Sequence, residues 1–202
     1  MNRNISSPCQ EKWDQRYRTQ PSLPAAAEVL TRNQQLLPSQ GKGLDIACGL
    51  GANSLFLARR GLEMEAVDIS PVALAALEQR AVEYDLPIST RRADLESGLE
   101  LKAGHFDLIV VSRYLHRPLC QKLVKSLAKK GGMLFYQTFA IDQNAAQGRA
   151  PTRLKGPRTL SYKLQANELL QLFASLETIY HFEDSDSSGV GAKMAFYVGR
   201  KR

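Results

Sequence analysis

A glycine-containing turn between an apolar strand and a helix constrains this chain more than any other feature. The stretch Leu44-Asp-Ile-Ala-Cys-Gly-Leu-Gly-Ala-Asn53 places Gly49 and Gly51 one residue apart. Such a turn lets the backbone approach a ligand without obstruction by Cβ atoms, and the start of the next helix presents free N–H groups. Asp68, seventeen residues after Gly51, ends the next apolar stretch, where a carboxylate suits ribose hydroxyls. The pattern favours a site for a nucleoside-containing cofactor.

The residues around this turn alternate between strand-like and helix-like patterns, which is typical of a parallel sheet with crossover helices. The last two strand-like runs have no helix between them, so we expect them to pair antiparallel. Together these patterns predict an α/β fold with a mainly parallel sheet that finishes in a hairpin. Ser70 with Pro71, and Gly61, are typical helix-start and helix-end residues. The expected strands are 43–47, 64–68, 88–93, 106–111, 133–139, 176–182 and 193–198; the expected helices are 53–60, 71–84, one from Pro118 to the glycines at 131–132, and 168–174 capped by Asn167.

Length and composition narrow the class of protein. A chain of 202 residues with 44% hydrophobic and 23% charged residues is ordinary for a globular protein, so we expect one domain over 1–202. The longest uncharged apolar stretch, 131–141, is too short to span a bilayer, and the N-terminus does not resemble a secretory signal. Cys9, Cys48 and Cys120 show no metal-ligand spacing and suggest a reducing compartment. We expect a cytoplasmic monomer or homodimer with no membrane partner and no bound metal.

Two alternatives remain for the glycine turn. In a nicotinamide dinucleotide site, the third glycine of Gly-x-Gly-x-x-Gly permits close packing of helix on strand, and Ser54 takes that position here. This departure disfavours a dehydrogenase. The other alternative is a tight turn that binds no ligand, and the acid at Asp68 argues against it.

Several segments, in order along the chain, resemble the motifs of class I S-adenosylmethionine-dependent methyltransferases. The turn at 45–51 resembles their first motif, and Val67-Asp68-Ile69-Ser70-Pro71 resembles their second-strand acid and helix start. Ala93-Asp94-Leu95 resembles the adenine-contacting motif, while 106–111 and 131–134 resemble the fourth strand and the turn into the fifth. The closing hairpin also matches this family. The resemblance implies a three-layer α/β/α sandwich with a Rossmann-like, mostly parallel seven-stranded sheet, and S-adenosyl-L-methionine as cofactor.

The resemblance also implies contacts with the cofactor, residue by residue. Gly49 and Gly51 would pass under its methionine and ribose parts, Asp45 would orient the methionine amino group through backbone or water, and Asp68 would bind the ribose hydroxyls. The chain departs from the family at Ala47, where the family often has glycine; alanine is tolerated there if φ is negative. The remaining implied contacts are Ile69 on the adenine face, Asp94 as acceptor for the adenine amino group, Leu95 beside it, and Ser112 and Arg113 at the methionine end.

Residues 1–40 form an N-terminal leader outside the expected sheet. Trp13-Asp14-Gln15-Arg16-Tyr17 resembles the leader of small methyltransferases related to tellurite-resistance and thiopurine enzymes, where it acts as a lid over the cofactor. That resemblance implies cofactor contacts for Trp13 and Arg16, the latter through a charge-assisted pair with the cofactor carboxylate. Alternatively, Trp13 and Tyr17 share a helix face and only hold the leader against the core. A further helix is expected over 24–38.

The residues after the fourth strand bear on the acceptor of the methyl group. Methyl transfer requires alignment of the reacting atoms and exclusion of water, and some acceptors also need a general base. Tyr114 and His116 are the acid–base candidates by position, since histidine ordinarily titrates near neutral pH. No Asn/Asp-Pro-Pro-Tyr signature and no Pro-Cys pair follow this strand, which disfavours methylation of adenine N6 and cytosine C5.

A basic connection over 141–166 is expected on the ligand side of the sheet. The net charge is +7, from 27 Lys and Arg against 20 Asp and Glu, which makes an anionic partner reasonable. The segment predicts either a lid that attracts an anionic acceptor or a solvated loop. We expect a small-molecule acceptor; RNA or protein methylation through 149–163 and a non-catalytic cofactor-binding module are the alternatives. Nucleic acid is less favoured because only Tyr162 adds an aromatic ring to the basic residues, which are Arg149, Arg153, Lys155, Arg158 and Lys163.

Overall fold

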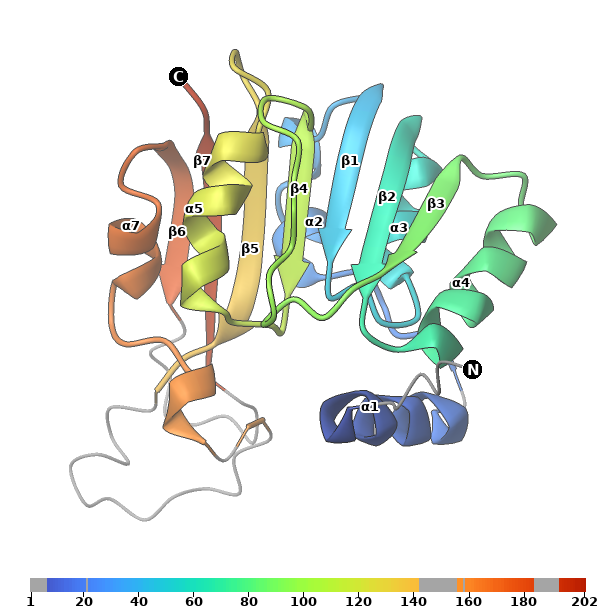
Figure 1. Ribbon diagram of the computed structural model, residues 1–202. Coiled ribbons are helices and arrows are strands. Elements are labelled where there is room, and N and C mark those ends of the chain that lie inside the picture. Colours follow the sequence, from blue (N-terminus) through green and yellow to red (C-terminus); the bar gives the residue numbers. More distant parts are fainter. Residues whose placement is uncertain (1–6, 21, 142–155, 158, 184–192) are drawn as a thin grey trace.

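The computed structural model describes residues 7–20, 22–141, 156–157, 159–183 and 193–202. Its strands are β1 (Gly41–Ile46), β2 (Leu62–Asp68), β3 (Ile88–Arg92), β4 (Leu108–Ser112), β5 (Met133–Phe139), β6 (Glu177–Glu183) and β7 (Met194–Arg200). They form one sheet in the order β3-β2-β1-β4-β5-β7-β6 (Figure 1). The strands β1 to β5 pair in parallel, and β7 pairs antiparallel with both β5 and β6. The expected mainly parallel sheet and closing hairpin are confirmed.

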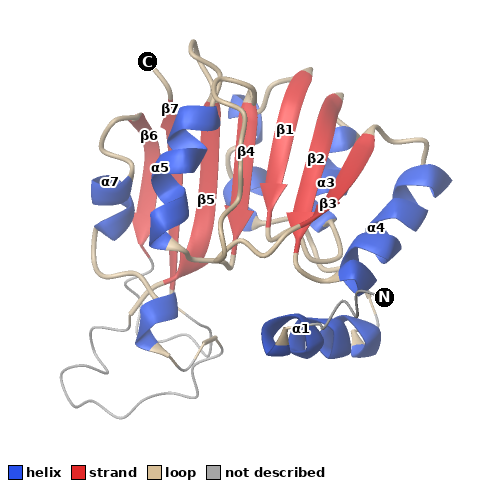
Figure 2. Ribbon diagram, in the orientation of Figure 1, coloured by secondary structure: helices blue, strands red, loops and turns tan. Residues whose placement is uncertain are grey.

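Helices cover both faces of this sheet (Figure 2). The helices are α1 (Pro8–Thr19), α2 (Glu28–Thr31), α3 (Ala52–Ala58), α4 (Pro71–Glu83), α5 (Arg117–Ser126) and α7 (Glu168–Leu172), with 3₁₀ turns η1 (Gln34–Leu36) and η2 (Leu160–Tyr162). Neighbouring residues of a strand point to opposite faces, and Ala66 and Val67 of β2 show this. Ala66 packs in a cluster with residues of α3 and α4, whereas Val67 packs in a cluster with residues of α5 and α7. The sheet is therefore the middle of three layers.

Local sequence signals account for the boundaries of the central helices. Ser70 caps α4, because its hydroxyl accepts a hydrogen bond from the Ala73 N–H at 3.2 Å. Gly61 has a φ of +102° and leads the chain from α3 into β2. Pro118 lies in the first turn of α5, where its missing N–H costs no hydrogen bond. These three boundaries are confirmed to within a residue or two, but α5 ends at Ser126 and does not continue to the glycines at 131–132 as expected.

The leader does not contain the helix expected over 24–38. Only the short α2 and η1 form there, and the chain before α2 is extended. The Ala27 N–H donates to Asn53 Oδ1 at 2.8 Å, and the Val29 N–H donates to Gln137 Oε1 at 2.9 Å. These buried contacts with α3 and β5 fix the path of the leader and override its local helix preference.

Asn167 does not cap α7 with its side chain, in contrast to the sequence prediction. Its φ is +59°, and its N–H donates to Glu183 Oε1 at the end of β6, at 2.8 Å. Glu168 turns back instead and accepts the Gln165 N–H at 2.8 Å. A carboxylate from a distant strand therefore decides the conformation at the start of α7.

Two segments face the edge at which the parallel strands end. In Figure 1, α1 and the orange η2 both lie beyond the arrowheads of these strands. Ligands of open α/β sheets bind at this edge.

The basic connection over 141–166 is described only in part. Lys163 is half-buried after η2, whereas four basic residues lie outside the described residues: Arg149, Arg153, Lys155 and Arg158. Among the described residues, no helix has the length and apolar character needed to cross a membrane.

Candidate functional site

The turn after β1 holds three residues in the left-handed backbone region. The φ angles are +56° at Ala47, +53° at Gly49 and +80° at Gly51. The condition under which alanine is tolerated at position 47, a negative φ, is therefore not met, and the alanine Cβ makes this conformation unfavourable by about 1–2 kcal/mol. A Cβ at Gly51 would collide with the side chain of Leu77 on α4. Gly51 is thus required by packing as well as by backbone conformation.

Asp45 is fully buried at the end of β1, beneath this turn. Its Oδ2 accepts hydrogen bonds from the Ser54 N–H at 3.1 Å and the Ser54 hydroxyl at 2.7 Å. Within the part of the chain that the structure describes, its buried Oδ1 accepts no hydrogen bond of normal geometry, although the Asn53 side chain lies near enough to favour the carboxylate. Burial outweighs these contacts and raises the pKa of Asp45 to about 7. A buried carboxylate oxygen in this state calls for a donor from a ligand or a water.

Asp68 joins the glycine turn to the end of β2. Its Oδ2 accepts the Gly49 N–H at 2.8 Å, and its Oδ1 accepts the Ser70 N–H at 2.9 Å. The side chain is buried, and this burial raises its pKa. A carboxylate has about four acceptor positions, so each oxygen keeps capacity for a hydroxyl donor. Ile69, the next residue, is half-buried at the same edge.

Helix α1 lies against the glycine turn and the start of α4. The Tyr17 hydroxyl would be 2.8 Å from a Cβ added at Gly49, so the phenol ring covers this glycine. Asp14 is buried and accepts a hydrogen bond from the Ser70 hydroxyl. These two contacts hold α1 over the glycine turn. A ligand bound at the turn would therefore be covered by this helix.

The leader residues expected to bind the cofactor lie on the same helix. Trp13 is half-buried and stacks on Tyr17 with the ring centroids 5.8 Å apart. Arg16 is exposed, and its guanidinium carbon lies 5.2 Å from the Trp13 ring centroid. Sequence reasoning assigned no cofactor contact to Asp14 or Tyr17, although the four-residue spacing of Trp13 and Tyr17 indicated their shared face.

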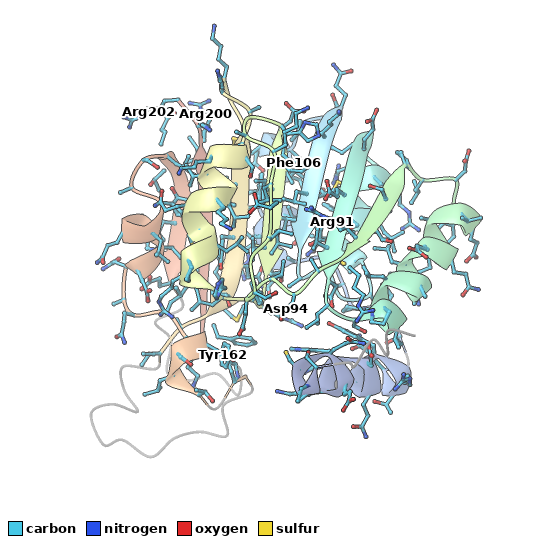
Figure 3. The ribbon with its side chains drawn as sticks, in the orientation of Figure 1. Arg91, Asp94, Phe106, Tyr162, Arg200 and Arg202 are labelled. Atoms are coloured by element: carbon cyan, nitrogen blue, oxygen red, sulfur yellow. The ribbon has the colours of Figure 1, made fainter. Side chains whose placement is uncertain are left out.

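Asp94 and Leu95 follow β3 and point in different directions. Figure 3 shows Asp94 at the carboxyl edge of the sheet. Asp94 is exposed, and its Oδ1 accepts the Glu96 N–H at 3.0 Å. The Leu95 side chain is buried in the core cluster that also contains residues of α5 and α7. Of the two, only Asp94 presents its side chain at the surface of this edge.

The chain turns sharply where β4 ends. Ser112 is half-buried, and Arg113 is exposed with a φ of +56°. The Arg113 N–H donates to the Gln137 carbonyl at 2.7 Å, which ties the turn to β5. A positive φ at a long side chain is unusual and marks strained backbone at this edge.

Tyr114 and His116 follow this turn. Tyr114 is half-buried, and its buried hydroxyl has no hydrogen-bond partner among the described residues. Burial and the nearby Glu96 and Asp94 carboxylates raise its pKa, so the phenol stays protonated at neutral pH and serves as a donor. His116 is half-buried and occupies the N-cap position of α5 without a side-chain cap.

The expected site residues thus fall into two groups at one edge. The first surrounds the glycine turn and joins Asp45, Gly49 and Asp68, covered by Tyr17. The second surrounds the Tyr114 hydroxyl, which is influenced electrostatically by Asp94, by Cys9 of α1 and by Tyr162 of η2. A Cβ at Gly51 would meet α4, and the Leu95 side chain lies in the core, so these two residues could face a ligand at the open edge only through their backbone.

Arg117 organises the segment after β5, and sequence reasoning gave it no role. Its Nε and Nη2 contact the two carboxylate oxygens of Glu168 at 2.5 and 2.9 Å. It also donates to the carbonyls of Ser161 at 2.8 Å and Lys163 at 3.0 Å. A bidentate pair of this kind is strong and directional, and it holds η2 beside α5. The two partners are 51 residues apart, so no local spacing reveals the pair.

One protein family matches the central part of the chain. Residues 44–132 match a family described as a methyltransferase domain. This span runs from β1 through β4 and α5 to the turn before β5, and it contains Asp45, Asp68 and Asp94.

Two curated relatives each match about half of the chain. A ribosomal RNA small subunit methyltransferase C from Idiomarina loihiensis is 38% identical over 91 residues, which is 45% of this chain and 26% of the relative. A ubiquinone biosynthesis O-methyltransferase from Xanthomonas axonopodis is 30% identical over 108 residues, which is 52% of this chain and 45% of the relative. The chain therefore spans less than half the length of these relatives.

Solved structures share the whole fold. TehB from Haemophilus influenzae has a TM-score of 0.69 at 20% identity, covering 96% of this chain and 67% of that one. A geranyl diphosphate C-methyltransferase from Streptomyces coelicolor, solved with S-adenosyl-L-homocysteine, has a TM-score of 0.68 at 12% identity, covering 98% and 100%. At these identities the likeness establishes the Rossmann-like sheet with its antiparallel end.

Proposed function

We propose that the chain transfers a methyl group from S-adenosyl-L-methionine to a small-molecule acceptor by direct displacement, because residues 44–132 match a methyltransferase domain. The observation that carries this proposal is the pair of hydrogen bonds from Gly49 and Ser70 to Asp68. They join the glycine turn and the end of β2 around a carboxylate with acceptor capacity left for ribose hydroxyls.

The charges of the site suit this cofactor. The bound group supplies an electrophilic methyl on a sulfonium cation, and two buried acids, Asp45 and Asp68, lie at the glycine turn. In the proposal, Asp45 orients the amino group, and Tyr17 excludes water above Gly49. The other proposed cofactor residues are Trp13 and Arg16 on α1, Gly51 in the turn, Ile69, Asp94 and Leu95 on the adenine side, and Ser112 and Arg113 at the end of β4.

Tyr114 and His116 are the proposed acceptor-side residues. Since the Tyr114 phenol stays protonated, it donates a hydrogen bond and orients the acceptor, which leaves His116 as the proposed general base for an acceptor that must lose a proton. The relative from ubiquinone biosynthesis is an O-methyltransferase, which is in keeping with an acceptor of this kind. We propose that the acceptor is anionic, because the segment 149–163 is rich in basic residues.

A second candidate function is methylation of RNA through the same basic segment. The ribosomal RNA methyltransferase among the relatives favours it, together with the net charge of +7. It predicts binding to poly(U) at low salt that weakens steeply as salt rises. If poly(U) does not bind at low salt, this candidate is removed. A non-catalytic cofactor-binding module remains the third candidate and predicts ligand binding without turnover on any acceptor.

Calorimetric titration with S-adenosylmethionine, S-adenosylhomocysteine and NAD tests the cofactor assignment. We expect the two sulfur nucleosides to bind and NAD not to bind. At about 100 times its dissociation constant, a bound nucleoside stabilises the fold by about 2.7 kcal/mol, which a thermal melt detects. Binding of NAD alone would overturn the assignment.

A single substitution tests the role of Asp68. We expect Asp68→Asn to weaken S-adenosylhomocysteine binding about tenfold or more, because the amide offers ribose hydroxyls one acceptor in place of two. Glu63→Gln is the matched control, since Glu63 lies exposed at the other end of β2. A folded Asp68→Asn protein with wild-type affinity would contradict the proposed site.

A further inference from the structure

A cavity lies between the leader and α3, and its lining includes neither Tyr114 nor His116 of the proposed acceptor side. Its volume is about 330 Å³, within the range of small-molecule sites. One wall is the extended leader segment before α2, and the other is α3, which begins directly after the glycine turn. The apolar lining comes from Leu23, Pro24 and Ala26 of the leader and Ala52, Leu55 and Phe56 of α3.

Two arginines complete the lining of this cavity. Arg59 and Arg60 follow the last turn of α3, and both are exposed. The Arg59 guanidinium lies 4.8 Å from the ring centroid of Tyr84, and the Arg60 guanidinium lies 4.5 Å from that of Phe56. Arg60 also donates to the side-chain carbonyl of Gln34. These contacts restrain both cations beside the cavity.

Neither arginine is neutralised by an acid within the part of the chain that the structure describes. The ion pairs found there involve other cations, such as Arg91 with Glu65 at 2.8 Å. That pair and Phe106 line a larger cavity of about 440 Å³, where Glu65 already compensates the positive charge of Arg91. The α3 cavity therefore combines apolar walls with two uncompensated positive charges, which the larger cavity does not.

We propose that this cavity binds an amphipathic anion, with an apolar chain or ring between the leader and α3 and an acidic head group at Arg59 and Arg60. Apolar walls favour a hydrocarbon body because burying it removes apolar surface from water. Guanidinium groups favour a carboxylate or phosphate head, which they bind through charge-assisted, bidentate hydrogen bonds. The site is separate from the methyl-transfer chemistry and does not rest on it.

Calorimetry with matched probes tests the proposal on the full chain. We expect octanoate to bind saturably, with both octanol and acetate binding at least about tenfold more weakly, because each lacks one of the two recognised parts. Octyl phosphate distinguishes the head groups: whichever anion binds more tightly identifies the acid that the arginines prefer. Equal binding of octanoate and octanol, or no saturable binding of either octyl anion, would overturn the proposal.

Two variants locate the binding. Arg59→Gln/Arg60→Gln should weaken octanoate binding about tenfold and leave octanol unchanged, whereas Leu23→Ser should weaken both. Arg80→Gln on α4 is the matched control and should behave as wild type, because Arg80 lies outside the cavity and contacts the Ala76 carbonyl of its own helix. A thermal melt establishes that each variant is folded. Wild-type octanoate affinity in both the double arginine variant and Leu23→Ser would overturn the assignment.

Discussion

Ala47 adopts a backbone conformation that glycine adopts without strain, at φ +56°. We expect Ala47→Gly to raise the free energy of unfolding by about 0.5–1 kcal/mol, because relief of the left-handed strain exceeds the entropic cost of a glycine. The urea midpoint measures this change. Ala75→Gly, at an exposed position inside α4, is the control and should lower stability by about 1 kcal/mol. A loss of stability in Ala47→Gly would contradict the strain argument.

Asp45 links stability to pH. Burial raises its pKa to about 7, so between pH 4 and 7 the folded protein keeps a proton that the unfolded chain loses. Its stabilising contribution is therefore complete below about pH 4 and is lost as the pH rises toward 7. Asp45→Asn removes this titration. We expect the unfolding free energy of wild type, relative to Asp45→Asn, to fall on the order of 3 kcal/mol between pH 4 and 7. A difference that does not change with pH would contradict the buried carboxyl.

Single residues were predictable from the sequence where the signal is local. The glycine turn and the acids at Asp45, Asp68 and Asp94 are read from motifs with fixed spacing. The positive φ at Ala47 was not predictable, because it depends on how the turn meets α4 and β2. The approach of Tyr17 to Gly49 likewise depends on the docking of α1, which no spacing within the leader specifies.

At the scale of elements, Arg117 holds η2 against α5 through Glu168 and two backbone carbonyls. We expect Arg117→Ala to increase amide hydrogen exchange over 159–168 about tenfold, while a peptide from α4 exchanges as in wild type. Arg117→Lys should give an intermediate rate, because lysine keeps the charge but not the bidentate geometry. Unchanged exchange over 159–168 in Arg117→Ala would mean that the arginine does not position η2.

Helices and strands were predictable wherever residues within the element itself determine its position in the chain. Ser70 and Pro71 fix the start of α4 locally, and the apolar run of β4 needs no distant partner to be recognised. The leader failed as a predicted helix because the Ala27 and Val29 N–H groups are bound by Asn53 and Gln137, side chains from distant elements. The prediction of Asn167 as a side-chain cap failed for the same reason, because the Asn167 N–H is bound by the distant Glu183.

On the scale of the whole molecule, Lys201, which directly follows β7, connects the sheet to helix α5. Its ammonium donates to the carbonyls of Val124 at 2.8 Å and Leu127 at 3.0 Å, at the end of α5. We expect Lys201→Met to lower the unfolding free energy by about 1–2 kcal/mol, since these carbonyls lose a charged donor. Lys130→Met, at an exposed position nearby, should change it by less than about 0.5 kcal/mol. Equal urea midpoints for the two variants would contradict this role.

The strand order also sets a sequence of events during protein synthesis. β6 leaves the ribosome before β7, yet β7 is the strand that lies between β5 and β6. Until β7 emerges, the edge of β5 exposes unpaired N–H and carbonyl groups, and β6 has no neighbouring strand to join. The parallel part of the sheet can therefore assemble during translation, while the closing hairpin is added as a unit. Nascent chains that stall between β6 and β7 would carry an open sheet edge, the state in which a chain of this fold is most exposed to strand-mediated aggregation.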